Sequence, residues 1–263
     1  MHMTHSISTA AGAAALALLA VPAVSFAQAV PVGVSGFNAD LVVSADAVMP
    51  YNDDADDFDI PNNYAYYETG LGGTTTTGLP VDGLVTAAGT GTNFDIADYT
   101  SDNALLLTAT DTTGTLTFNT PTALDSLSIL AVSTNGGGTG ALVIGFSNGT
   151  TMTTDYQAPD WFGDSTGTTP MGNSYMPALQ GLGRVSTDNG SIEQPGGNPD
   201  LYETVIDLNG MTVTSLTFTG VADNANTTTG VFGISGVRSD VPEPASLGLL
   251  GLAGLALVRR RRA

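Results

Sequence analysis

The feature that most restricts the fold is the near absence of helix-period patterns between residues 28 and 240. Short runs of β-branched and aliphatic residues alternate with polar residues instead, and Gly, Asn, Asp and Pro separate the runs. Threonine, a β-branched residue that favours strands, occurs 37 times, and glycine, a common turn residue, occurs 33 times. Regularly spaced short strands with turn residues between them predict an all-β fold, an antiparallel β-sandwich.

The runs expected to form strands lie at 37–43, 104–108, 114–119, 124–132, 141–146, 151–156, 201–208, 213–219 and 231–237. Asn148-Gly149 joins two of these runs and is the strongest hairpin signal in the chain. Two long connections, 48–95 and 157–199, interrupt the rhythm. Connections of this length without regular structure are usually functional or poorly ordered.

The charge and the missing residue types exclude several classes of function. The formal net charge is −19, and residues 30–240 carry 24 acidic residues against Arg184 and Arg238 alone, a net charge of −22. Such a segment repels phosphate backbones, so we expect no nucleic-acid partner. The chain has no cysteine, and its two histidines are His2 and His5. Disulfides, zinc sites of the usual ligand types and His-dependent nucleophiles are therefore excluded from the body, residues 28–240.

The first 27 residues have the pattern of a secretory signal. A short polar segment precedes an apolar run of mainly Ala and Leu at 10–24, and Ser25 and Ala27 place small residues at the −3 and −1 positions. We expect an N-terminal signal helix, with signal peptidase as a partner that cleaves between Ala27 and Gln28. The alternative is a buried core helix, but the run lacks an amphipathic face.

The C-terminal residues form a second separate unit. Prolines at 242 and 244 break any helix that enters from the body, and an apolar stretch at 245–258 leads to a cluster of arginines. As a helix this stretch would span about 21 Å, against a hydrocarbon core of about 30 Å. That is short for a permanent anchor. We expect a hydrophobic membrane helix that crosses at least transiently, with the arginines on the cytoplasmic side.

This tail resembles the PEP-CTERM sorting signal of Gram-negative bacteria. The matching residues are Val241, Pro242, Glu243 and Pro244, the apolar helix 246–258, and Arg259, Arg260, Arg261 and Arg262. The resemblance covers residues 241–263 only. It implies an exosortase as the partner that processes the tail, and a destination on the outer surface or in the extracellular matrix, with membrane tethering before processing. A chance Pro-Glu-Pro before a core helix is the alternative.

A weaker resemblance concerns the body. The order of runs from the hairpin at 144–151 to the strand ending at 234 resembles galactose-binding-like jelly-roll domains, which occur as carbohydrate-binding modules and accessory domains. Because the matching residues are mostly turn and core types, this resemblance implies a jelly-roll-like fold and no activity. The expected domains are a signal peptide at 1–27, a β-sandwich at 28–240 and a sorting tail at 241–263.

An acidic cluster is the candidate metal site. Its oxygen-bearing side chains are close in sequence, and calcium takes six to eight oxygen ligands in flexible geometry. The alternative is a solvated, self-repelling loop, and the cluster lacks the glycine and glutamate of an EF-hand loop. The candidate ligands are Asp53, Asp54, Asp56, Asp57 and Asp59.

Two aromatic patches are candidate ligand sites. The first is a candidate glycan site, since aromatic faces stack on sugars and carboxylates accept their hydroxyl hydrogen bonds. The second lies beside the acidic cluster in sequence and is a candidate lining of a groove. The first patch is Asp160 with Trp161, the single tryptophan, and its alternative is a core aromatic. The second is Tyr64 and Tyr66, which alternation places on one strand face with Tyr67 on the other. An edge strand that packs one face is the alternative for the second patch.

The sequence therefore predicts an exported, non-catalytic protein of the cell surface or extracellular matrix that associates with extracellular polysaccharide. A calcium-dependent carbohydrate-binding module and a glycoside-active enzyme remain as alternatives. Glu193 and Glu203 are the carboxylates we would choose for the enzyme. Without His or Lys, however, most general acid–base helpers are missing from the body.

Overall fold

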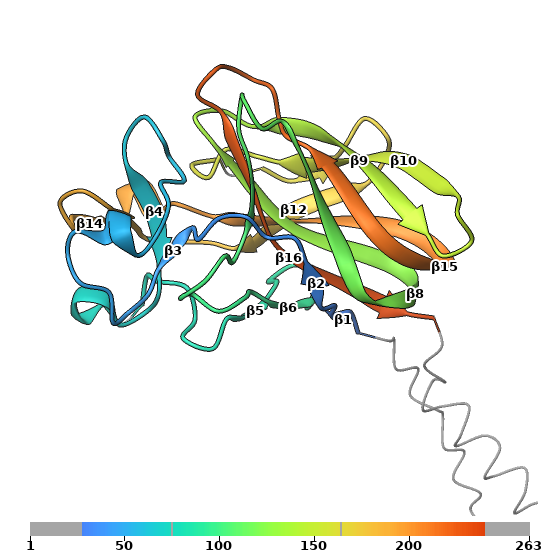
Figure 1. Ribbon diagram of the computed structural model, residues 1–263, viewed down its shortest axis with the longest axis horizontal. Helices are drawn as coiled ribbons and strands as arrows, with labels where there is room; N and C mark the ends of the chain where they lie inside the picture. The colour runs from blue at the N-terminus through green and yellow to red at the C-terminus, as the bar shows by residue number, and fades with distance from the viewer. Residues whose placement is uncertain (1–27, 75, 164, 240–263) are drawn as a thin grey trace, which may run out of the picture. The chain divides into compact units, whose positions relative to one another are not determined.

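The computed structural model describes residues 28–74, 76–163 and 165–239. These residues form short and long strands with three single-turn 3-10 helices between them (Figure 1). The strands up to the middle of the chain are β1 (Val30–Pro31), β2 (Val34–Ser35), β3 (Val42–Val43), β4 (Tyr64–Tyr67), β5 (Leu84–Thr86), β6 (Asn93–Asp95), β7 (Leu105–Leu107) and β8 (Thr113–Thr134). The rest are β9 (Gly138–Phe146), β10 (Thr151–Ala158), β11 (Gly167–Thr168), β12 (Ser174–Leu179), β13 (Arg184–Ser186), β14 (Ile192–Glu193), β15 (Leu201–Thr219) and β16 (Thr228–Arg238). The 3-10 helices are η1 (Tyr51–Asp53), η2 (Leu71–Gly73) and η3 (Pro195–Gly197).

Two long antiparallel strands, β8 and β15, organise the fold. They pair along almost their whole length, from Tyr202 with Ala131 to Thr219 with Thr113. The sequence predicts two separate strands at 114–119 and 124–132 and two more at 201–208 and 213–219. In the structure β8 and β15 each continue through the residues between the predicted strands. In β15 these residues include a bulge at Asn209 and Gly210, which have φ angles of +52° and +78° and shift the register between Asp207 and Met211. An Asn-Gly pair thus bends a strand here instead of ending it.

One end of this pair forms what we call the bare half. It consists of residues 113–119 of β8 and 213–219 of β15, joined by β2 on one side and by β9 and β10 on the other. Alternation is strict: Leu116 and Phe118 are buried in the main core, whereas Thr115 and Thr117 between them are exposed. The predicted hairpin is confirmed, because β9 and β10 pair across a turn in which Gly149 has a φ of +80°.

The other end forms the covered half. Residues 124–134 of β8 lie between the first part of β15 and β16, and β12 extends the sheet beyond β15. Leu127 and Ile129 face the main core, while Leu130 and Val132 face a second core on the opposite side of the sheet. Both faces are therefore buried, which explains a nearly continuous apolar run in this part of the strand.

The layer over the covered half comes from the two long connections. They contain β4, β5 and β6 and β11 to β14. With β3, which precedes the first connection, three of these strands form a four-stranded sheet in the order β14-β13-β4-β3, which lies to one side of the long strands in Figure 1. This sheet has a small core of its own, made by Val43, Tyr51, Ala55, Ala65, Tyr67, Leu71 and Val185. The prediction that 48–95 and 157–199 lack regular structure was wrong.

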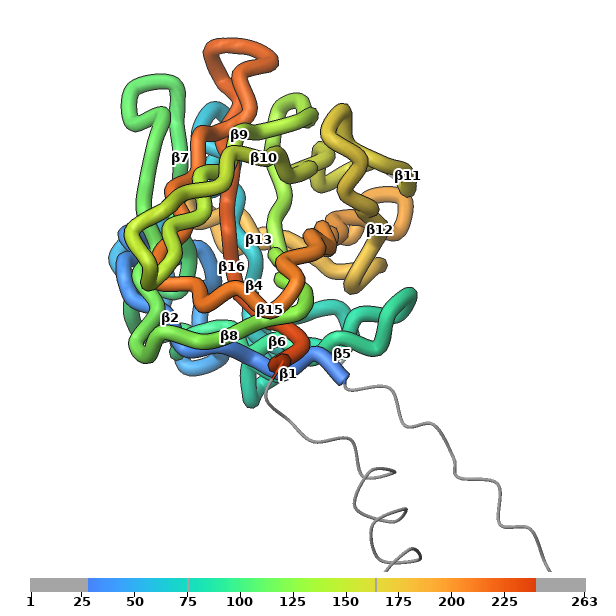
Figure 2. The backbone as a smooth tube through the Cα atoms, turned by 90° about the vertical axis from the view of Figure 1, so that its right-hand side faces the viewer, coloured from blue at the N-terminus to red at the C-terminus, as the bar shows by residue number. Residues whose placement is uncertain are grey.

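The predicted all-β class is confirmed, and the strand pairs are antiparallel except for β3 with β4. The layers are consistent with a β-sandwich, and Figure 2 shows the strands of the body packed against one another in a second view. The expected signal helix and terminal hydrophobic helix lie outside the described residues. Among the residues that are described, no helix is long and apolar enough to cross a membrane.

Candidate functional site

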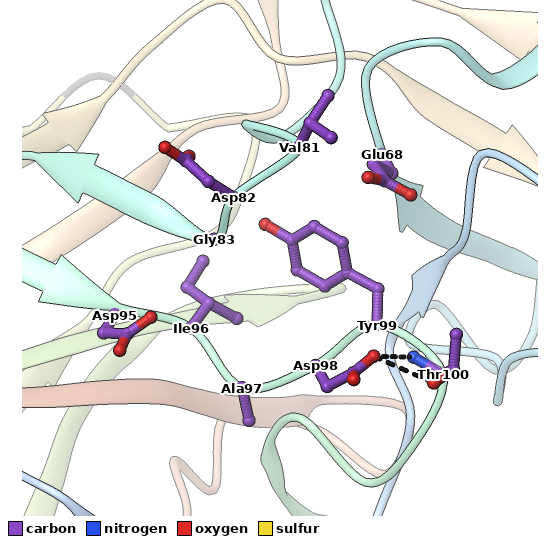
Figure 3. Close-up of a pocket in the computed structure, with 10 residues that line it drawn as sticks. All are labelled: Glu68, Val81, Asp82, Gly83, Asp95, Ile96, Ala97, Asp98, Tyr99 and Thr100. Atoms are coloured by element: carbon purple, nitrogen blue, oxygen red, sulfur yellow. Dashed lines mark hydrogen bonds between the residues drawn. The ribbon is translucent and has the colours of Figure 1, made fainter.

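A cavity of about 400 Å³ with an acidic lining opens beside the β5–β6 hairpin. Its lining includes Glu68 after β4, Asp82 before β5, Asp95 at the end of β6, and Asp98 and Tyr99 in the following turn. Figure 3 shows the Tyr99 ring between these side chains, with the four carboxylates spaced around it. No basic residue is among its lining residues.

Backbone amides hold three of these carboxylates in place. The amide of Ala45 donates to Glu68 at 2.7 Å, and the amide of Leu84 donates to Asp82 at 3.2 Å. Asp98 accepts hydrogen bonds from the amide and the hydroxyl of Thr100, at 2.9 and 2.8 Å. The hydrogen bond from the Thr100 amide, followed by that from its hydroxyl, lowers the pKa of Asp98 below its usual value.

Tyr99 lies beneath the carboxylates and is 6% exposed. Its hydroxyl donates to the carbonyl oxygen of Pro80 at 2.9 Å. Burial raises the pKa of Tyr99 well above its ordinary value, and the charges of Glu68, Asp82 and Asp95 raise it further. The phenol therefore stays protonated, and the pocket offers hydrogen-bond acceptors and negative charge to cations or to hydroxyl groups.

The structure disperses the five aspartates of the candidate metal site. Asp54 accepts from the Ser44 amide at 3.0 Å and Asp56 from the Asp40 amide at 3.2 Å, whereas the Thr187 hydroxyl donates to Asp57. Asp53 is exposed. Within the described residues, no three Asp, Glu, His or Cys side chains are placed to hold a metal ion together. The geometry thus gives these carboxylates structural partners, and calcium binding stays a prediction.

Asp59 is buried and has several side-chain partners of its own. It accepts hydrogen bonds from Asn62 at 2.9 Å and Asn135 at 2.8 Å, and it lies 3.7 Å from the Arg184 guanidinium. It therefore ties the acidic loop to β8 and to β13.

Trp161 and Tyr66, two of the candidate ligand-binding residues, are core residues. Trp161 is 2% exposed and Tyr66 is fully buried, and their rings meet edge to face at 5.4 Å. Phe58 and Phe232 complete the cluster with further edge-to-face contacts. Neither ring is available to stack on a sugar, so the core alternative describes these two residues.

The β4 strand is also not an edge strand, because β3 and β13 pair with it on its two sides. Alternation holds as predicted. Tyr66 belongs to the second core, the one that Leu130 and Val132 face, and Tyr64 packs against that core. Tyr67 belongs to the small core of the β3–β4–β13–β14 sheet.

The remaining candidates, Tyr64 and Asp160, act in structural contacts. Asp160 accepts hydrogen bonds from the amides of Gly136 at 2.6 Å and Phe162 at 2.9 Å, which fix the turn after β10. Tyr64 is half-buried, and its hydroxyl donates to Glu193 at 3.0 Å. The guanidinium of Arg184 lies 3.8 Å from the Tyr64 ring centre.

Arg184 is a contact centre that the sequence analysis missed. Its guanidinium also lies 4.9 Å from the Phe162 ring and 3.1 Å from Glu193. The one signal that points to it is its rarity, since residues 30–240 contain only two basic residues. Its partners come from β4, the turn after β10 and β14, so only tertiary structure brings them together.

The two glutamates chosen for a glycoside-active enzyme have different surroundings. Glu193 is engaged by Tyr64 and Arg184, as described. Glu203 on β15 is fully buried and accepts a hydrogen bond from the Thr90 hydroxyl at 2.5 Å, while its other oxygen has no hydrogen-bond partner among the residues that the structure describes.

Comparison with known proteins identifies the tail. No curated protein matches the chain. Residues 240–262 match the family model described as the PEP-CTERM protein-sorting motif. The predicted sorting residues, from Val241 to Pro244 and Arg259 to Arg262, fall within this match, and they lie outside the described residues, as does the expected signal cleavage site at Ala27. This chain therefore carries a PEP-CTERM protein-sorting motif, the mark of an exported protein that is sorted through an exosortase.

Proposed function

We propose that this protein is a non-catalytic component of the cell surface or extracellular matrix and that it associates there with polysaccharide. The sorting motif at 240–262 is the observation that carries the proposal, since it directs an exported protein to the cell surface. In this proposal signal peptidase removes residues 1–27, an exosortase processes the tail, and the body is the working part outside the cell.

The composition of the body favours a binding role over a catalytic one, because the body contains no histidine or lysine for general acid–base catalysis. A body of net charge −22 stays soluble and separate from other acidic polymers, which suits a component of a hydrated matrix. The finer prediction of a jelly-roll-like sandwich belongs to the same proposal, because such sandwiches serve as non-catalytic modules.

Cell fractionation tests the sorting step. In the bacterium that makes the protein, we expect the unchanged chain in the surface and matrix fractions, freed from the inner membrane. The triple variant Pro242→Ala, Glu243→Ala, Pro244→Ala should stay with the inner membrane in its unprocessed, heavier form. Ser239→Ala, immediately before the matched motif, is the control and should behave as the unchanged chain. Equal processing and location of all three proteins would refute the proposal.

A carbohydrate-binding module is the second candidate, and the pocket around Tyr99 favours it. Four carboxylates at the rim of one cavity can accept several hydroxyl hydrogen bonds from a sugar. The test is a glycan-binding screen of the unchanged protein and the Asp82→Asn, Asp95→Asn variant, in calcium and in chelator. Loss of a saturable signal in the variant supports the module, and loss in chelator adds calcium to it. An unchanged signal in the variant excludes this pocket.

A further inference from the structure

The outer face of the bare half is a continuous array of small uncharged side chains, which we call the hydroxyl face. Register places its residues in three rows across β8, β15, β9 and β10, and the strands lie side by side in Figure 1. Ser35 on β2 extends one row. The face consists of Ser35, Thr113, Thr115, Thr117, Ala141, Val143, Gly145, Thr151, Thr153, Ser215, Thr217 and Thr219.

These side chains are accessible, and none carries a charge. The threonines of β8 and β10 in the face are exposed, and Val143 is 36% exposed. Asp155 on β10 lies in register with the row of Ala141 and Thr219, but it is buried. It accepts hydrogen bonds from Thr169, Asn173 and the Met171 amide, so the β11–β12 loop covers it. An uncharged face of this size contrasts with the net charge of −22 on residues 30–240.

The hydroxyl groups are fixed in position before any partner arrives. The sheet that carries them is hydrogen-bonded on both sides of β8, β15 and β9, and β-branched side chains have few χ1 rotamers. The hydroxyls of Thr115 and Thr217 are 2.8 Å apart and orient each other. Strand geometry gives the face dimensions of about 13 Å along the strands and about 19 Å across them. A rigid array of this kind loses little entropy on binding.

One edge of the face runs into a groove. Thr219 lines both the face and a cavity of about 410 Å³, which the β7–β8 and β15–β16 loops form with Leu107, Ala109 and Val221. The two loops project at the same end of the strands in Figure 2. A long ligand could therefore lie across the rows and continue into a concave, mostly apolar end site.

We propose that the hydroxyl face binds an uncharged, extended polysaccharide. The proposal rests on the function proposed above and names the surface and the ligand class. Threonine and serine hydroxyls both donate and accept hydrogen bonds, as sugar hydroxyls do, and the adjoining methyl groups of threonine, alanine and valine match the C–H surfaces of sugar rings. Charge complementarity selects a neutral polymer: the body repels polyanions, and the face offers no carboxylate to a polycation.

Co-sedimentation with insoluble neutral glucan tests the proposal, with microcrystalline cellulose as the probe and polygalacturonate as the acidic comparison. The protein is purified as the cells export it. Thr117→Val with Thr153→Val removes two exposed hydroxyls and keeps the β-branched shape. Thr166→Val with Thr168→Val is the matched control, because both threonines are exposed but lie outside the face.

We expect the unchanged protein and the control to bind the neutral glucan and to ignore polygalacturonate. The Thr117 and Thr153 variant should show a Kd about tenfold higher, because good hydrogen bonds are lost. Equal binding by both variants would overturn the inference and leave the proposed function intact, with another surface responsible. No binding to cellulose, or a face variant that changes only self-association in sedimentation velocity, would also overturn it. Fractionation of the sorting variant is independent of all these results.

Discussion

The two halves of the β8–β15 pair have the same strands, pairing and main core, and differ in what lies on the outer side. On the covered half, Leu130 and Val132 turn outward into a second core. On the bare half, Thr115 and Thr117 occupy the equivalent outward positions and are exposed. A single strand thus changes from strict alternation to a continuous apolar run where a second layer begins. The order of apolar and polar residues along a strand therefore indicates whether one or both of its faces are buried.

The comparison also assigns separate tasks to the halves. The covered half contains the aromatic cluster and the Arg184 contacts, which anchor the layer formed by the long connections. Among the described residues no such layer lies over the outer face of the bare half, so its hydroxyl-bearing side chains are partly or fully exposed. Substitutions on the two sides should therefore have unequal effects on stability.

Trp161→Ala should have the largest effect, because it empties the centre of the layer over the covered half. Trp161 is 2% exposed and contacts Phe58 and Tyr66 edge to face. We expect the free energy of unfolding to fall by about 3–5 kcal/mol, measured by urea denaturation. Phe162→Ala is the control at the next position, which is 37% exposed, and should lose about 1 kcal/mol or less. Equal losses in the two variants would contradict the assigned packing.

Asp40 should make the stability of the layer over the covered half depend on pH. Its side chain accepts a hydrogen bond from the Val42 amide at 3.2 Å and another from Asn103. Burial raises the pKa of Asp40 from 3.8 to about 7, and the nearby charges of Asp54 and Asp56 add to the rise. The folded state therefore holds the proton more tightly than the unfolded state does. The contribution of Asp40 to stability is full below pH 4, falls between pH 4 and pH 7, and is constant above that range.

Asp40→Asn should remove this pH dependence. The asparagine keeps an acceptor for Val42 and carries no charge, so the variant should be more stable than the unchanged protein at pH 8. We expect a difference of about 2 kcal/mol, roughly half of what the full pKa shift would give, because solvent screens the part of Asp40 that is not buried. The difference between the two proteins should shrink steadily toward pH 4. Urea denaturation at a series of pH values measures it. A constant difference from pH 4 to pH 8 would show that Asp40 does not titrate in this range.

Arg184→Met should have a smaller effect on the same layer. The guanidinium has contacts with Tyr64 at 3.8 Å, Phe162 at 4.9 Å and Glu193 at 3.1 Å, and its side chain is 17% exposed. Loss of a cation–π contact and a partly exposed ion pair should lower the free energy of unfolding by about 1–2 kcal/mol. Arg238→Met, at the exposed end of β16, should change it by less than about 0.5 kcal/mol. Similar effects of both substitutions would refute the role of Arg184.

The sequence predicts the bare half well and the layer over the covered half poorly. Strands such as β9 and β10 are eight or nine residues long, so alternation and an Asn-Gly turn identify them. The strands β3, β13 and β14 have two or three residues each, too few to show a period of two. Their conformation depends on pairing with distant partners, which no local pattern records.

The functional residues show the same contrast between features that a local pattern reveals and features that depend on distant contacts. The sorting tail is readable because its three features occur in order within one short segment. The pocket around Tyr99 draws on Glu68, Asp82 and Asp95, which only the fold brings together. Trp161 attracts attention as the single tryptophan, yet rarity does not distinguish a buried ring from an exposed one. Local chemistry thus indicates where the protein goes, and tertiary contacts decide which side chains remain accessible.

The smallest stability effect should come from the hydroxyl face itself. Thr117→Val with Thr153→Val should leave the free energy of unfolding within about 0.5 kcal/mol of the unchanged protein, because both side chains are exposed and valine favours strands. The reverse change on the covered half, Val132→Thr, buries a hydroxyl at a fully buried position and should cost about 1–2 kcal/mol. Urea denaturation of the two variants side by side measures the contrast. A loss above about 1 kcal/mol in the threonine variant would mean that the face is held by internal packing, and its hydroxyls would then not be free for a ligand.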